Sequence, residues 1–121
     1  MSANQNLMKF GAYVKALQLF DLVVADLSPL AAQMNLSRLI GQQFASADSV
    51  ASNIEEGYGR GSTKEYAQFL VIARGSAQET AGRYGRFKHW LPQAVVDERQ
   101  ALCHEIIGFL TGSISTLRAG K

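Results

Sequence analysis

Apolar side chains recur at intervals of three and four positions along four stretches of the chain, a spacing that places them on one side of an α-helix. In the first stretch these residues are Phe10, Tyr13, Val14, Leu17, Phe20, Val24 and Leu27. Similar stripes occupy the other three stretches, and the strand signal is weak throughout. The pattern predicts helices over residues 6–27, 37–56, 62–90 and 93–117.

Local signals at the ends of these stretches support the predicted boundaries. Pro29 ends the first helix, because a helix rarely continues through the residue before a proline. Ser62 and Glu65 have the spacing of a capping box and begin the third helix. Pro92 separates the third helix from the fourth, and Gly57 is placed where a glycine just past the end of the second helix is expected.

Four helices of similar length with short connections favour antiparallel packing of neighbours. We therefore predict an all-α fold, an antiparallel up-and-down four-helix bundle that forms one domain over residues 1–121. Apolar residues make up 47% of the chain and charged residues 18%. Because few charged groups are available to cover the outside, we expect another subunit to cover part of the apolar surface.

The third predicted helix carries apolar residues on two sides. Val71 and Ile72 fall opposite Tyr66 and Tyr84, and a helix that is apolar on both sides is normally covered on both sides. Gly75 lies nearby, and a mid-helix glycine costs about 1 kcal/mol relative to alanine, which is tolerated where backbones approach closely. Val71, Ile72 and Gly75 are therefore the predicted oligomer interface. The alternative is that the two apolar side chains are simply exposed.

Basic residues gather along the third helix and the turn before it. They are Arg60, Lys64, Arg74, Arg83, Arg86 and Lys88. We expect Arg83 and Arg86 on the outward side with Glu79, whereas Lys88 leans the other way, so the cluster is loose. The net charge of +2 permits nucleic-acid binding without demanding it. The six residues are candidate contacts to RNA, DNA or an acidic partner, and the alternative is a set of solvated side chains.

The histidines and the cysteine lack the spacing that a catalytic or metal site requires. A di-metal bundle needs Glu-x-x-His motifs, but Arg86 precedes His89 and Ala101 precedes His104 at that spacing. Cys103 lies in an apolar stretch, where a thiol usually packs as a small hydrophobe. We therefore predict no catalytic residue, no metal site and no cofactor.

The glycine-rich turn over residues 57–63 resembles a phosphate-binding loop only in part. It lacks the lysine before the final Ser or Thr, and a helix rather than a strand precedes it. Free N–H groups at the start of the third helix leave anion binding open, but we favour a turn as the role of these glycines.

The lone cysteine indicates a reducing compartment, and no apolar run reaches the roughly 20 residues of a membrane span. These two features predict a cytoplasmic protein without membrane partners.

Glu55 and Glu56 lie at the C-terminal end of the second predicted helix, where the helix dipole disfavours negative charge. They are therefore expected to have partners. Candidates are Arg60, Lys64, Arg74 and the free N–H groups at the start of the third helix, which would form a clasp between the second and third helices.

The segment over residues 49–60, SVASNIEEGYGR, resembles the hallmark of the four-helix bundle protein family that includes the 23S rRNA intervening-sequence proteins, also labelled S23 ribosomal proteins. The matching motif residues are Asn53, Glu55, Glu56, Gly57, Gly59 and Arg60. The resemblance continues through Lys64-Glu65-Tyr66, Phe69-Leu70, Ile72-Ala73, Gly75-Ser76 and Glu79. Two departures stand out: Ala51 replaces the family's proline, and Phe44-Ala45 occupies positions where relatives often carry two arginines.

The resemblance implies an up-and-down bundle that assembles as a ring of five. A related branch, the accessory variability proteins of diversity-generating retroelements, binds nucleic acid and a reverse transcriptase. By that resemblance this chain is expected to be a non-enzymatic homo-oligomer, a pentamer, with RNA, DNA or a reverse transcriptase as candidate partners. The alternative is a protein-binding scaffold without nucleic acid.

Overall fold

The computed structural model describes residues 6–120, except for the side chain of Met34. Four long helices are α2 (Gly11–Leu27), α3 (Ser37–Tyr58), α4 (Thr63–Arg86) and α5 (Gln93–Ala119). The short 3-10 turns η1 (Ser28–Leu30) and η2 (Met34–Leu36) join α2 to α3, and η3 (Phe87–His89) follows α4. The described residues contain no strand, so the predicted all-α class is confirmed.

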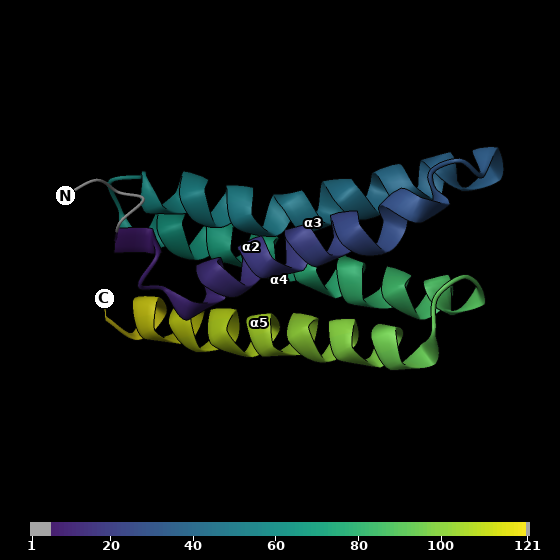
Figure 1. The fold of residues 1–121 in the computed structure, drawn as a ribbon. Coiled ribbons are helices and arrows are strands. Elements are labelled where there is room, and N and C mark those ends of the chain that lie inside the picture. The colour runs from purple at the N-terminus through teal and green to yellow at the C-terminus, as the bar shows by residue number, and fades with distance from the viewer. Residues whose placement is uncertain (1–5, 121) are drawn as a thin grey trace.

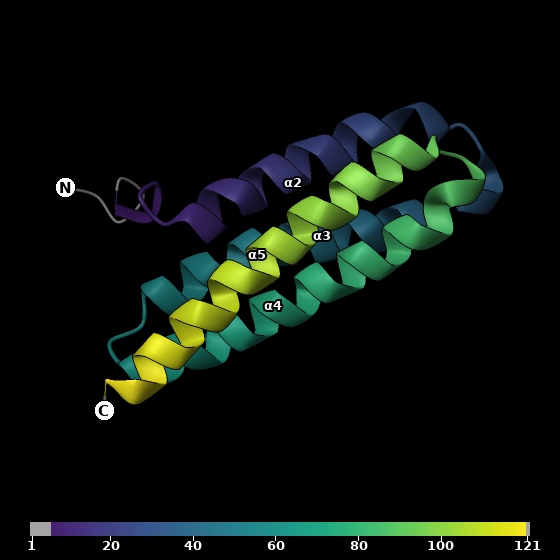
Figure 2. The same ribbon diagram turned by 90° about the horizontal axis from the view of Figure 1, so that it is seen from below.

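The helices run side by side along one long axis, and each is antiparallel to the next in the chain (Figures 1 and 2). α3 packs against α2 and α4, and α5 also packs against α2 and α4. α2 and α4 therefore lie opposite each other across the bundle, and the start of α2 and the end of α5 are at the same end of it. This arrangement is the predicted up-and-down four-helix bundle.

Apolar side chains from all four long helices fill the interior. The largest fully buried ones are Leu19, Leu27, Ile54, Leu70, Tyr84, Phe87, Ile106 and Leu110. Most of them belong to the predicted stripes, but Leu19 does not.

The row of α2 that was predicted to face the core was mostly wrong. The fully covered row of α2 runs through Ala12, Ala16, Leu19 and Val23, and Tyr13 and Leu27 are the members of the predicted stripe that are buried. The predicted residue Leu17 is only partly covered. Because α2 is apolar around most of its circumference, its spacing alone does not determine which row faces the core.

The observed ends of the helices differ from the predictions where the backbone leaves the helical conformation. Phe10 is extended, with φ −89° and ψ 111°, so α2 begins at Gly11 rather than at residue 6. At the start of α4, Ser62 Oγ accepts the N–H of Glu65 at 3.1 Å, which confirms the predicted cap. The Glu65 carboxylate accepts the Ser62 hydroxyl at 3.2 Å rather than returning to the Ser62 backbone.

Gly57 lies inside α3 rather than past its end, which corrects the sequence prediction. A Cβ added at Gly57 would lie 2.7 Å from Cβ of Phe69 and 3.0 Å from Cδ1 of Tyr66, both on α4. The absence of a side chain therefore allows the two helices to approach closely at this point.

A buried polar cluster fastens α2 to the opposite half of the bundle. The Tyr84 hydroxyl on α4 donates to Asp26 Oδ2 at 2.7 Å, and Arg99 on α5 donates to both oxygens of the same carboxylate at 2.8 and 3.1 Å. Asp26 therefore joins three helices through charge-assisted hydrogen bonds.

Replacement of Gly57 by alanine is expected to lower the free energy of unfolding by about 1–2 kcal/mol. The reason is that overpacking costs roughly 1–3 kcal/mol, which exceeds the ~1 kcal/mol gained in helix propensity. The matched control is Gly41→Ala, also within α3, where an added Cβ meets nothing within 4 Å. Urea unfolding should show Gly41→Ala to be stabilising. Equal effects of the two substitutions would contradict the close approach at Gly57.

Candidate functional site

A chain of hydrogen bonds runs along the contact between α3 and α4, and we call it the polar seam. Its members are Gln43, Ser46, Ser49 and Asn53 from α3, and Ser76, Thr80 and Arg83 from α4. Serine and threonine at spacings of three and four give each helix a narrow polar row. Because these side chains are short, the helices approach closely enough for the two rows to bond to each other.

The middle of the polar seam consists of hydroxyl groups. Ser76 donates to Ser49 Oγ at 2.9 Å, and the hydroxyls of Ser46 and Thr80 lie 2.8 Å apart. Asn53 extends the row by donating to Ser49 Oγ and to the Ser49 carbonyl, each at 2.8 Å.

Arg83 closes the polar seam at its other end. Its Nη1 donates to Gln43 Oε1 at 2.9 Å and to Ser46 Oγ at 3.0 Å, while Gln43 Nε2 donates to the Thr80 carbonyl at 2.9 Å. Arg83 is 9% exposed, and its Nε–H is buried with no acceptor among the described residues. The guanidinium is therefore held by neutral groups.

Burial lowers the pKa of Arg83, because the charged form is desolvated, and the Arg86 charge lowers it further. The Glu79 charge raises it, but no Glu79 oxygen lies within the 4.0 Å of an ion pair. Arginine stays protonated in proteins, so the seam contains a positive charge without a carboxylate partner. A shallow groove of about 340 Å³ lies over it, lined by Gln42, Ala45, Ser46, Ser49, Ser76, Glu79 and Arg83.

The six basic candidates do not form one surface. Arg83 faces α3 and is buried, which corrects the expectation that it points outward with Arg86. Arg74 faces α5, where its Nη1 donates to Thr111 Oγ1 at 3.2 Å. Arg86 and Lys88 are exposed at the C-terminal end of α4 and in η3. Arg60 and Lys64 are exposed at the other end, around the start of α4.

The hallmark motif builds the corner at which α3 turns into α4. Glu56 and Arg60 form an ion pair at 2.9 Å, and the Arg60 guanidinium lies 5.2 Å from the centre of the Phe69 ring on α4. This arrangement links α3 to α4 through a cation–π contact. Gly57 provides the close approach described above, and Gly59 is the C-terminal cap of α3.

Glu55 does not belong to a clasp between α3 and α4, as the sequence suggested. Its Oε2 accepts the Tyr13 hydroxyl of α2 at 2.6 Å. The hydrogen bond to Glu55 is the largest cause that raises the pKa of Tyr13 to about 12, followed by burial and the Glu55 charge. Sequence reasoning missed this pair because 42 residues separate its members.

The three candidate interface residues differ in their surroundings. Val71 packs partly against the core of its own chain, so its predicted place on a fully separate side of the helix was wrong. Ile72 is 52% exposed, and a Cβ added at Gly75 would meet nothing within 4 Å. Ile72 and Gly75 therefore lie on the outward face of α4, and the interface itself stays a prediction.

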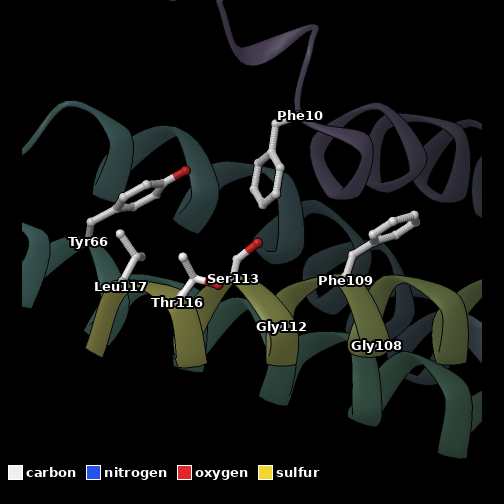
Figure 3. Close-up of a pocket in the computed structure, with 8 residues that line it drawn as sticks. All are labelled: Phe10, Tyr66, Gly108, Phe109, Gly112, Ser113, Thr116 and Leu117. Atoms are coloured by element: carbon white, nitrogen blue, oxygen red, sulfur yellow. The ribbon is translucent and has the colours of Figure 1, made fainter. Parts of the chain in front are cut away.

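A second surface feature is an apolar hollow of about 510 Å³, which we call the Phe109 hollow. It is lined by Phe10, Tyr66, Gly108, Phe109, Gly112, Ser113, Thr116 and Leu117. Figure 3 shows Phe10 reaching from the segment before α2 toward the glycine-containing face of α5. Phe109 is 45% exposed at this hollow.

The lone cysteine does not line the groove over Arg83 or the Phe109 hollow. Cys103 is fully buried, and burial raises the pKa of its thiol to about 12, so it packs as a hydrophobe. Within residues 6–120, no three His, Cys, Asp or Glu side chains gather as a metal site would require. None of the helices in this part of the chain has the length and apolar character to cross a membrane.

The model of the family described as 23S rRNA-intervening sequence protein matches residues 8–112, which include the whole polar seam and the α3–α4 corner. This chain belongs to that family. No curated protein and no solved structure matches the chain. Membership in the 23S rRNA-intervening sequence protein family agrees with the resemblance found in the hallmark motif.

Replacement of Tyr13 by phenylalanine should lower the free energy of unfolding by about 1–2 kcal/mol at pH 8, because a hydrogen bond to a charged group is lost. The folded pKa of about 12 lies above the ordinary 10.0, so the contribution is complete below pH 10 and disappears as the pH rises through 12. Urea unfolding of both proteins between pH 8 and 12 measures this. The exposed Gln18→Glu variant on α2 controls for general effects of alkali, and a difference that persists at pH 12 would contradict the prediction.

Proposed function

We propose that this member of the 23S rRNA-intervening sequence protein family works by self-association, as a non-catalytic homo-oligomer that holds a partner. The observation that supports this most directly is the outward face of α4. A helix that packs against α3 and α5 on its two inner sides still exposes half of Ile72. The glycine at position 75 leaves room beside it for another backbone.

A ring needs two different surfaces on each copy, because its contacts are head to tail. The bundle offers an apolar projection at Ile72 and an apolar depression at the Phe109 hollow. Ile72 does not line the hollow, which lies among α5, the segment before α2 and Tyr66 of α4, so the two surfaces are distinct. This pair of surfaces supports a head-to-tail ring, and the number of five copies rests on the resemblance.

The self-association proposal predicts a mass of five times the 13.2 kDa chain in light scattering at micromolar concentration. Ile72→Glu should shift the protein toward the monomer by at least about tenfold in dissociation constant, because a charge would be buried at the contact. The control is Gln18→Glu on α2, which adds the same charge on the opposite helix of the bundle. A monomeric wild-type chain would overturn the proposal.

A second variant tests the other surface. Gly112→Leu should fill the Phe109 hollow without straining the fold, since an added Cβ at position 112 meets nothing within 4 Å. Closed rings should then give way to smaller species, while the melting temperature stays close to that of the wild type.

Nucleic acid is one candidate partner of such an assembly. Lys64, Arg86 and Lys88 are exposed, and none forms an ion pair with a described residue. On one copy these charges are too few and too spread for strong binding, but symmetry repeats them around a ring and adds avidity. A reverse transcriptase or another protein is the alternative partner.

Nucleic-acid binding is tested by fluorescence anisotropy with single-stranded RNA and DNA between 50 and 200 mM salt. We expect joint replacement of Lys64 and Lys88 by glutamine to reduce the slope of log K against log salt by about 0.7 per lost phosphate contact. Lys9→Gln, on the turn before α2, is the control. Absence of binding at 50 mM salt would leave the protein-binding scaffold as the function.

A further inference from the structure

The guanidinium of Arg83 combines burial with an incomplete set of partners. Nη1 donates to Gln43 Oε1 and Ser46 Oγ and, at 3.4 Å, to the Gln42 carbonyl. Nε is buried without an acceptor, and Nη2 makes no hydrogen bond to the described residues. The side chain is nine-tenths buried and still lines the groove between α3 and α4. A charge in this setting is partly desolvated, and no carboxylate of the described residues forms an ion pair with it.

Such a charge is costly unless something pairs with it. Buried ions in folded proteins are normally paired and hydrogen-bonded, because neutral acceptors compensate only part of the lost hydration. Residues 6–120 provide neutral acceptors for Arg83 but no carboxylate within ion-pair distance. The neighbouring Arg86 adds repulsion, and Glu79 acts only from a distance.

The groove over Arg83 belongs to the same face of α4 as the proposed interface. Ser76, Glu79 and Arg83 follow Ile72 by four, seven and eleven positions, a spacing that aligns them along one side of a helix. The α3 wall of the groove contributes small residues, Ala45 and Ser49 among them. A surface that seats against Ile72 therefore continues directly over the Arg83 groove.

We propose that this groove receives a carboxylate side chain from a neighbouring copy of the chain, which pairs with Arg83. The inference rests on the self-association proposed above and names the polar contact within it. An aspartate supplies one negative charge to pair with Arg83. Glu79 also lines the groove and repels any anion there, a doubly charged phosphate more strongly than a singly charged carboxylate.

Two aspartates of the chain are candidates for the incoming carboxylate. Asp21 on α2 and Asp48 on α3 are exposed and make neither an ion pair nor a side-chain hydrogen bond to any described residue. The other exposed carboxylates, apart from Glu79 in the groove itself, already have partners within the chain. We therefore assign the incoming carboxylate to one of these two aspartates.

The experiment measures the dissociation constant of the assembly by sedimentation equilibrium for the single variants Arg83→Gln, Asp21→Asn and Asp48→Asn. It also measures the two double variants that combine Arg83→Gln with one of the aspartate replacements. Arg83→Gln should weaken assembly by about tenfold or more, as truncation of one partner of a desolvated charge pair does. One aspartate variant should weaken it similarly and add little in combination with Arg83→Gln. The other aspartate serves as the matched control.

Thermal unfolding of each variant separates assembly from folding. The aspartate variants change exposed side chains and should fold normally. They therefore show whether an aspartate contributes to assembly even if Arg83→Gln is unstable. If Ile72→Glu dissociates the assembly but neither aspartate shows coupling to Arg83, the groove inference is wrong and self-association stands. A wild-type chain that stays monomeric would remove the self-association proposal and, with it, the occupant of the groove.

Discussion

The close approach of α3 to α4 is the constraint on which the rest of this bundle depends. It requires Gly57 at one end, where a Cβ would collide with Phe69, and a row of hydroxyl side chains along the middle. Larger apolar residues at Ser49 or Ser76 would push the helices apart and break the hydrogen bonds between them. Packing explains four residues of the hallmark motif, since Glu56, Gly57, Gly59 and Arg60 form this corner, whereas Glu55 bonds to Tyr13 of α2.

The same contact produces the unusual electrostatics of the molecule. A seam of serine, threonine and glutamine can accept hydrogen bonds from a guanidinium, so Arg83 is drawn inward and surrounded by neutral oxygens. Its charge then lies under the groove between α3 and α4, and no carboxylate of the described residues forms an ion pair with it. The proposed contact with a neighbouring copy therefore involves a residue that also holds α3 and α4 together.

α2 is held differently, by polar contacts toward both of its ends. Tyr13 bonds to Glu55 of α3, and Asp26 accepts from Tyr84 of α4 and Arg99 of α5. In each case a tyrosine hydroxyl donates to a carboxylate on a different helix. Because α2 is apolar on most sides, these directional bonds specify its rotation where hydrophobic contact alone would permit several.

The sequence by itself determined the number, type and order of the helices, the cap at Ser62 and the family, because periodicity, capping and motif spacing are local properties. It also indicated Ile72 as an exposed apolar position. Only the tertiary structure decided which row of α2 is buried, that Arg83 turns inward while Arg86 stays outside, and that Glu55 pairs with Tyr13. These outcomes depend on which side chains of a neighbouring helix lie at the same level along the bundle. Contacts between residues some 40 positions apart leave no trace in local spacing.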